Sequence, residues 1–167
     1  MDLRLRPYRV DDEETALAIN EAMVADDFQF LLGWNDALTW SRFLAAIEDQ
    51  RRGRNLRGDQ VRAVQLAADV GGELVGRVSI RFELNEFLAQ KGGHIGYGVA
   101  PAHRRRGYAS EILRQALVVI RAEGVSPVLV ACDENNVGSA RTIERNGGIY
   151  ESSVPHEKSA IRRYWIW

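Results

Sequence analysis

The sequence predicts a mixed α/β domain in which a mixed central sheet carries helices on both faces. Two apolar runs flank Gly71-Gly72, a pattern typical of a β-hairpin. Residues 108–122 place apolar side chains on one helical face, and residues 127–132 then read as a buried strand. A strand–helix–strand crossover over residues 93–132 should therefore place its two strands parallel to each other.

The first half of the chain is expected to supply a strand, two helices and the hairpin. A short strand from Leu3 ends at Pro7. The acidic run at 11–14 is typical of a helix start, because carboxylates are favoured at the positive end of the helix dipole. From Trp40, apolar residues recur at i, i+3, i+4 and i+7, which predicts a second helix. In chain order, the later elements are this helix within Asp36–Gln50, a solvated loop at Arg51–Asp59, and hairpin strands at Val61–Val70 and Glu73–Leu84.

The second half is expected to complete the sheet. The strand at 92–99 is rich in glycine, which weakens a strand interior and indicates a bulge or a close approach by ligand or backbone. Gly124 ends the amphipathic helix that starts at Tyr108. In chain order, the remaining elements are a strand at Pro127–Cys132, a short helix at Ser139–Arg145 closed by Asn146-Gly147-Gly148, and strands at Ile149–Glu151 and Ile161–Trp167.

Composition limits the class of protein. The 167 residues (46% hydrophobic, 27% charged) are expected to form one domain over residues 1–167. Lys and Arg number 22 against 23 Asp and Glu, so a nucleic-acid binder that works by phosphate neutralisation is disfavoured. The one cysteine, Cys132, excludes an internal disulfide and a clustered cysteine metal site. No apolar run could span a bilayer and no signal peptide is evident, so a cytoplasmic location is expected.

One loop carries features of an anion-binding site. Residues 98–109 run from a strand end into a helix start and contain three consecutive arginines, Arg104 to Arg106, followed by Gly107. Free backbone N–H groups and the positive end of the helix dipole favour a phosphate there, and a glycine lets it approach the backbone. The stretch is neither a Walker loop nor a GxGxxG dinucleotide fingerprint. On local chemistry alone, a basic surface loop before an amphipathic helix is the alternative.

Two motifs together resemble the GNAT N-acetyltransferase superfamily. Arg104-x-x-Gly107-x-Ala109 is similar to its acetyl-CoA signature, Arg/Gln-x-x-Gly-x-Gly/Ala, and a strand precedes it. About thirty residues later, the stretches 132–139 and 143–148 resemble the family's strand, Asn-x-x-Ser/Ala helix and closing glycine. The resemblance covers residues 3–167. The segment 93–97 with Asn146-Gly147-Gly148 looks like a bacterial subgroup of undefined substrate.

The resemblance implies a GNAT-like acyl-CoA N-acyltransferase fold with acetyl-CoA wedged between two splayed parallel strands. A bulge near Tyr97 and Gly98 would expose backbone groups, and the Val99 N–H would donate to the thioester carbonyl as an oxyanion donor. Asn136 and Ser139 would face the pantetheine arm, although a plain helix N-cap also explains Asn136. The implied cofactor-binding residues are Tyr97, Gly98, Val99, Arg104, Arg105, Arg106, Gly107, Tyr108, Ala109, Ser110, Asn136 and Ser139.

The implied reaction is acetyl transfer to an amine of a small molecule or peptide by direct attack in a ternary complex. Many family members place an acidic tyrosine seven residues after the motif asparagine, where this chain has Ile143. Besides Val99, the candidate catalytic residues are therefore His94, Tyr97 and Glu83, with Glu134 as a further carboxylate.

Other residues have two interpretations. Cys132 could be an acyl-accepting nucleophile, but a small buried core residue is the simpler interpretation. The four tryptophans could line an acceptor pocket or pack in the core. The polar run of Arg81, Glu83 and Asn85 is expected to border the acceptor site, and a solvent-facing position would explain it almost as well.

Three functions are compatible with these sequence features. The first is an acetyl-CoA-dependent N-acetyltransferase that needs no metal, acts away from membranes and nucleic acid, and could pair through its aromatic C-terminal strand as a homodimer. The second is a non-catalytic acyl-CoA-binding sensor or interaction protein, which the isoleucine at 143 favours slightly. The third is a nucleic-acid binder that uses the three consecutive arginines, which the balanced charge disfavours.

Overall fold

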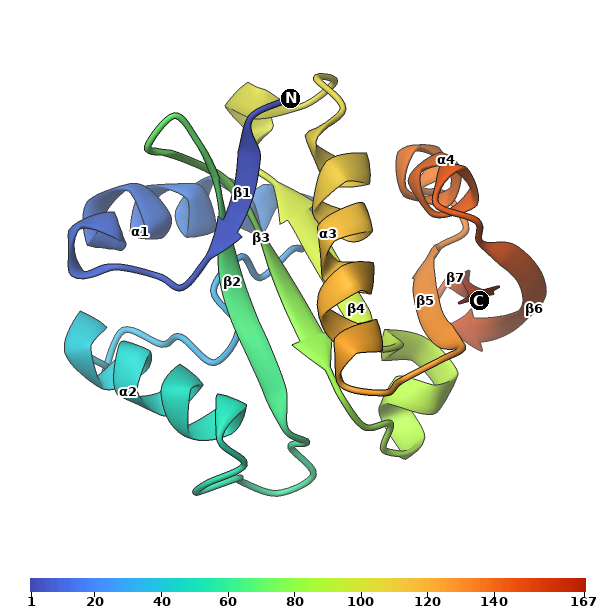
Figure 1. Ribbon diagram of the computed structural model, residues 1–167, viewed down its shortest axis with the longest axis horizontal. Coiled ribbons are helices and arrows are strands. Elements are labelled where there is room, and N and C mark those ends of the chain that lie inside the picture. The colour runs from blue at the N-terminus through green and yellow to red at the C-terminus, as the bar shows by residue number, and fades with distance from the viewer.

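The computed structural model describes residues 1–167 and contains two antiparallel sheets. Figure 1 shows the two sheets side by side, with the long helix α3 in front of the larger one. In spatial order, the larger sheet holds β1 (Leu3–Arg6), β2 (Ala63–Val70), β3 (Glu73–Arg81) and β4 (Ile95–Val99), and the smaller holds β5 (Val128–Asp133), β7 (Ser159–Ile166) and β6 (Ile149–His156). The helices are α1 (Glu13–Ala22), α2 (Trp40–Arg51), α3 (Tyr108–Ala122) and α4 (Val137–Arg145), with short turns η1 (Val10–Asp12), η2 (Val24–Asp26), η3 (Leu88–Gly92) and η4 (Pro101–His103).

Side-chain alternation along the strands gives the larger sheet two different faces. Val78 and Ile80 of β3 belong to the core cluster that packs against α3, which itself buries five apolar side chains. The alternate positions, such as Arg77 and Ser79, lie on the opposite face, toward the helices α1 and α2. There a second core forms around Phe30 and other aromatic side chains. The fold class predicted from the sequence, a mixed α/β domain with helices on both faces of the sheet, is confirmed.

Most expected elements are present, and their limits have local causes. The helix α3 spans residues 108–122 as predicted. The helix α2 begins at Trp40 rather than near Asp36, because the Thr39 side chain accepts a hydrogen bond from the Arg42 N–H and caps it there. The last two strands are longer than expected and form a hairpin, in which β7 lies between β5 and β6.

The parallel ladder expected across the β4–α3–β5 crossover does not form. The two strands meet at one place only, where the His94 N–H donates to Leu129 O at 2.7 Å. Gly93 makes this approach possible, because a Cβ there would lie 2.7 Å from the Leu129 carbonyl oxygen. Beyond this point β4 pairs only with β3, and β5 pairs only with β7. The gap between β4 and β5 is the opening that separates the two sheets.

The bulge expected near Tyr97 and Gly98 is also absent. The register of β4 against β3 runs without a shift from Ile95 to Val99. The glycines of this strand instead make room for side chains on the α1 and α2 face. A Cβ on Gly98 would lie 2.5 Å from the Phe28 ring, and one on Gly96 would lie 3.3 Å from the Arg81 guanidinium. The expectation of a close approach therefore holds, but side chains and the Leu129 carbonyl make it.

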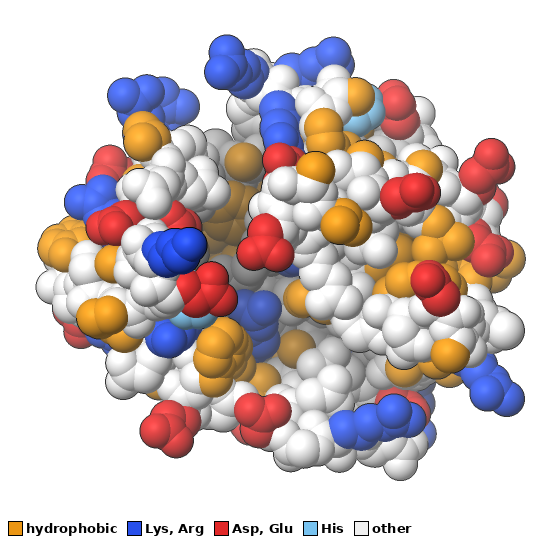
Figure 2. All heavy atoms as spheres, turned by 180° about the vertical axis from the view of Figure 1, so that it is seen from behind, with side chains coloured by type: hydrophobic (Ala, Val, Ile, Leu, Met, Phe, Trp, Pro, Cys, Tyr) orange, Lys and Arg blue, Asp and Glu red, His pale blue; other side chains and the backbone are white.

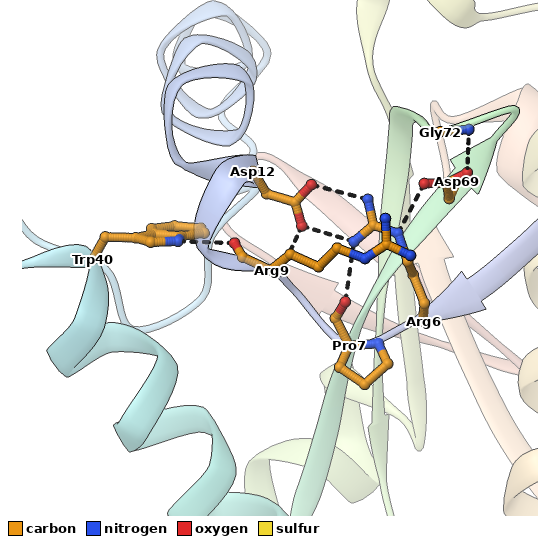
Figure 3. Close-up of polar contacts among 7 residues, drawn as sticks. All are labelled: Arg6, Pro7, Arg9, Asp12, Trp40, Asp69 and Gly72. Atoms are coloured by element: carbon orange, nitrogen blue, oxygen red, sulfur yellow. Dashed lines mark hydrogen bonds and ion pairs between the residues drawn. The ribbon is translucent and has the colours of Figure 1, made fainter.

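A buried ion-pair network fixes the N-terminal strand. Figure 3 shows the Arg6 guanidinium between Asp12 and Asp69, with nitrogen–oxygen distances of 2.7 and 2.8 Å. Asp12 also accepts from the Arg9 N–H, and the Arg9 carbonyl accepts from the Trp40 indole at 3.0 Å. The network thus joins β1, η1, β2 and the start of α2, and it fixes these four elements relative to one another.

Candidate functional site

The molecule is hollowed near the centre of its rear face, where both apolar and basic side chains are visible inside (Figure 2). One cavity, of about 530 Å³, lies where β4, the start of α3 and the start of α4 come together. Of the residues expected to bind a cofactor, it is lined by Tyr97, Gly98, Val99, Arg104, Arg105, Gly107, Tyr108, Ala109, Ser110, Asn136 and Ser139, and only Arg106 is missing.

The helix α3 enters this cavity with an uncapped N-terminus. Gly107 is its N-cap residue and adopts φ 80°, a left-handed conformation that glycine takes without strain. The first N–H groups of a helix have no intrahelical partner, and no side chain caps those of α3. The macrodipole adds partial positive charge at the same point. This end of the cavity is therefore suited to hold an anion such as a phosphate.

The arginines around the cavity have different roles. Arg104 pairs with Asp26 at 2.8 Å, and its Nε donates to the Val99 carbonyl at 3.3 Å, so it braces the end of β4. Arg105 lines the cavity beside the helix start, with its backbone in the left-handed region at φ 63°. Arg145, at the end of α4, lines the cavity from the other side. Arg105 and Arg145 thus both add basic residues to the lining of the cavity.

The register of β4 determines where its backbone donors point. The Ala100 N–H donates to the Val75 carbonyl at 2.8 Å, so it faces β3. Because N–H direction alternates along an antiparallel strand, the Val99 N–H points the other way, toward the gap between β4 and β5. Val99 also lines the cavity. Its N–H is therefore not used in the ladder with β3.

Tyr97 and Ser139 join β4 to α4 beside the cavity. The Tyr97 hydroxyl lies 2.8 Å from the Ser139 hydroxyl across the gap. Burial raises the pKa of Tyr97 to about 12, although the hydrogen bond from Ser139 acts in the opposite direction. The phenol is therefore protonated at neutral pH. Asn136 caps α4 by accepting from the Ser139 N–H at 3.0 Å, so the N-cap interpretation of Asn136 is confirmed and it also lines the cavity.

Comparison with known proteins identifies the family. The family model described as "Acetyltransferase (GNAT) domain" matches residues 2–149. The chain belongs to the GNAT acetyltransferase family. A curated relative, the uncharacterized N-acetyltransferase YjdG of Bacillus subtilis (strain 168), is 32% identical over 74 residues. That match covers 44% of this chain and only 41% of YjdG.

Solved structures of other proteins share the fold over nearly the whole chain. RimJ of Mycobacterium smegmatis, solved in complex with CoA-disulfide, has a TM-score of 0.76 at 18% identity, over 98% of this chain and 81% of that one. The putative acetyltransferase yncA of Salmonella typhimurium, solved with its cofactor acetyl-CoA, has a TM-score of 0.65 at 16% identity, over 99% and 94%. These likenesses support the fold, and the resemblance inferred from the two sequence motifs is confirmed at the level of the family.

Two of the candidate catalytic residues of this GNAT chain lie outside the cavity. His94 is buried, and its Nδ1 accepts a hydrogen bond from the Leu129 N–H at 2.9 Å. Burial lowers the pKa of His94, and the charge of Arg81 lowers it further, so the imidazole is neutral and serves to join β4 to β5. Glu83 is exposed beyond the end of β3 and does not line the cavity.

The position at which many GNAT members carry a tyrosine is closed. Ile143 is fully buried in α4 and packs in the main core. Cys132 is buried in the same core, where burial raises the pKa of its thiol, and this favours the packing interpretation over a nucleophile. Trp40 and Trp34 pack together in the second core, and Trp167 is exposed. Neither the tryptophans nor Cys132 lines the cavity.

Several lining residues were not foreseen from the sequence. Phe28 and Asp26 come from the segment between α1 and α2, which carries no recognisable motif. Thr142 and Arg145 lie one and two turns into α4, where helical spacing from Ser139 could have indicated them. No helix of the chain has the length and apolar character needed to cross a membrane. Nowhere do three or more His, Cys, Asp or Glu side chains gather in a way that could hold a metal ion.

Proposed function

We propose that this protein is an N-acetyltransferase that uses acetyl-CoA to acetylate an amine by direct attack in a ternary complex. The observation that carries the proposal is the uncapped N-terminus of α3, which opens into a cavity that also contains the Val99 N–H and the Tyr97 hydroxyl. An anion-binding helix start, an oxyanion donor and a neutral phenol in one cavity are the groups that acyl transfer from a charged thioester carrier requires.

The binding end of the cavity would hold the diphosphate. Acetyl-CoA supplies an activated thioester when it is bound. The N–H groups at the start of α3 donate to phosphate oxygens, and the Arg105 and Arg145 guanidinium groups add positive charge. Gly107 lets the phosphate approach the backbone N–H groups closely, because it carries no Cβ between the phosphate and the backbone. Ala109, one of the next residues of α3, is small and keeps the approach open.

The reacting end would hold the carbonyl and the departing sulfur. The Val99 N–H donates to the oxygen on which negative charge develops, and such a preorganised donor stabilises the transition state. Tyr97 keeps its proton until well above neutral pH, so it is in the form that can protonate the leaving thiolate. The proton that the amine nitrogen loses as the amide forms returns to the phenolate. Ser139 holds the phenol oxygen at 2.8 Å and orients it toward the cavity. In this proposal Tyr97 takes the role that the buried Ile143 cannot.

A thiol-release assay with a panel of amines tests the proposal. Acetyl-CoA is incubated with the protein and single amines of small molecules and peptides, and both free thiol and acetylated amine are measured. We expect equal amounts of the two products with at least one amine. Tight binding of acetyl-CoA without release of thiol for any amine would instead favour a non-catalytic acyl-CoA sensor. Salt-dependent binding of DNA that coenzyme A leaves unchanged would favour a nucleic-acid binder.

A further inference from the structure

A second cavity, of about 490 Å³, lies on the other face of the larger sheet, between α2, η3 and the strands β2 and β3. Its floor is polar, although both cores of the molecule are apolar. Gln65 and Ser79 are buried there, and Arg81 extends from the end of β3. Three arginines and two aspartates line this cavity, so its charged side chains are positive on balance.

Arg81 is a largely buried cation without an acidic partner. Its Nη1 donates to the backbone oxygens of Gly92 at 3.2 Å and Gly93 at 3.4 Å. Burial lowers the pKa of Arg81, and no neighbouring carboxylate opposes this effect. By contrast, Arg6 is paired with two carboxylates. A guanidinium withdrawn from water in this way is stabilised by an anion that can accept from its remaining N–H groups.

The two aspartates of the cavity are not paired with Arg81. The Asp49 carboxylate accepts from the Asn55 side chain at 3.0 Å, and the backbone carbonyl of Asp59 accepts from the Asn85 side chain at 2.7 Å. Neither aspartate forms an ion pair with Arg81. The charge of Arg81 is therefore left for a ligand.

The position of Arg81 relates the second cavity to the acyl-transfer site. Its guanidinium lies against Gly96, three residues before Val99 on β4. The strand from Gly96 to Val99 is about 10 Å long. A hydrogen bond between the guanidinium and an anionic group takes about 3 Å, and the approach of an amine to the acyl carbon takes about 3 Å more. An acceptor that fits between would have about 4 Å between its amine and its anionic group, as a short amino acid has. The Phe28 ring lies over Gly98, between Gly96 and Val99 along β4.

We propose that the acceptor is a small amine carrying an anionic group a few bonds away, as in a short amino acid, and that Arg81 binds that group. This inference rests on the proposed N-acetyltransferase function. Arg81 would act as a specificity residue, since it holds the anionic end of the acceptor while the amine faces the gap between β4 and β5. The same chemistry applies to a carboxylate and a phosphate, because the guanidinium fork matches both.

A matched panel of amines tests this proposal. Glycine, β-alanine and 2-aminoethyl phosphate are compared with the neutral glycinamide and β-alaninamide, at constant acetyl-CoA. We expect kcat/KM about 10- to 100-fold higher for the anionic members, as the loss of one charge-assisted hydrogen bond would predict. Comparison of kcat/KM between the two carboxylates and the phosphate identifies the anionic group that the site prefers. Equal or better turnover of the amides would overturn the proposal.

Substitution of Arg81 is the second test of this proposal. Arg81→Gln should raise KM for the anionic amines about 10- to 100-fold and leave KM for the amides unchanged, whereas Arg81→Lys should fall between. Arg42→Gln, an exposed arginine of α2 outside both cavities, is the control and should change neither. An equal rise for anionic and neutral amines would contradict a role of Arg81 in recognition. Thermal melting of each variant reports whether it folds.

A binding measurement separates this inference from the proposed function. β-Alanine and β-alaninamide are titrated into the protein saturated with coenzyme A, and heat is recorded without any reaction. Saturable binding of β-alanine that Arg81→Gln abolishes would support the anion site even if no amine were acetylated. No binding of β-alanine at millimolar concentration would overturn the anion site, even if other amines were acetylated.

Discussion

Removal of one oxygen atom, by Tyr97→Phe, tests the proposed acid directly. The phenol oxygen lies 2.8 Å from the Ser139 hydroxyl beside the cavity, and its pKa is raised to about 12. If Tyr97 protonates the leaving thiolate, we expect kcat to fall by about 100-fold or more, because a positioned general acid contributes about 10² to 10⁴ in rate. KM for acetyl-CoA should change little, since the diphosphate site on α3 is untouched.

The effect on folding should be small by comparison. The ring of Tyr97 stays in place in the variant, and one hydrogen bond to Ser139 is lost, which costs about 1 kcal/mol. For a chain of this length that corresponds to a fall in Tm of about 2 to 4 °C. A loss of activity much larger than the loss of stability would therefore reflect chemistry.

Steady-state thiol release between pH 7 and 9.5 is the assay, with Ser139→Ala as the matched control. Because the pKa of Tyr97 is raised, its proton is retained over this whole range, and the wild-type rate should show no decline that depends on Tyr97 as the pH rises. Ser139→Ala keeps the phenol and should lose less activity than Tyr97→Phe. A Tyr97→Phe variant with wild-type kcat would refute the assignment of the acid.

Three further predictions concern the fold and the wall of the cavity. Arg6→Met should lower the free energy of unfolding at pH 7 by about 3 kcal/mol in urea titrations, because it leaves buried carboxylates unpaired. Burial alone would raise the pKa of Asp12, but the hydrogen bonds from Arg6 and Arg9 outweigh it and hold the pKa below its usual value. Wild-type stability should therefore be full above about pH 4 and fall at lower pH, and Arg6→Met, which keeps only the Arg9 bond, should show a smaller acid-dependent loss. Ile112→Ala, at a fully buried position of α3, should cost about 2 to 5 kcal/mol by the same titration, and a cost below 1 kcal/mol would contradict the packing described. Gly98→Ala should cost about 1 to 3 kcal/mol and weaken acetyl-CoA binding, because its Cβ would displace the Phe28 ring, and unchanged calorimetric affinity would argue against that wall.

The elements that sequence predicted well are those with local causes. The helix α3 has a strong apolar period and a glycine at each end, so its limits at 108 and 122 could be read directly. The hairpin at Gly71-Gly72 is likewise specified by its own residues, both of which adopt positive φ. The loop that leads into α3 could be predicted to line a cavity for the same reason, because its residues are contiguous.

What the sequence could not supply depends on contacts between distant segments. Gly98 signals a close approach, but nothing in the pattern says that Phe28, seventy residues earlier, makes it. His94 is the histidine on the strand expected beside the cofactor, and only the fold reveals that its Nδ1 is engaged by the Leu129 N–H. The separation of β4 from β5 is a relation between two sheets formed by distant segments, and no local signal encodes it.

A calorimetric titration of acetyl-CoA tests the central claim most directly, with Gly107→Glu and Gly124→Glu as a matched pair. Both glycines adopt left-handed φ, 80° and 83°, so both substitutions impose a similar backbone strain, but only Gly107 lies in the cavity, at the start of α3. We expect wild-type protein and folded Gly124→Glu to bind with similar affinity. Folded Gly107→Glu should not bind, because its carboxylate would compete with the diphosphate for the helix N-terminus. Equal affinity of all three proteins, or no binding by the wild type, would contradict the account.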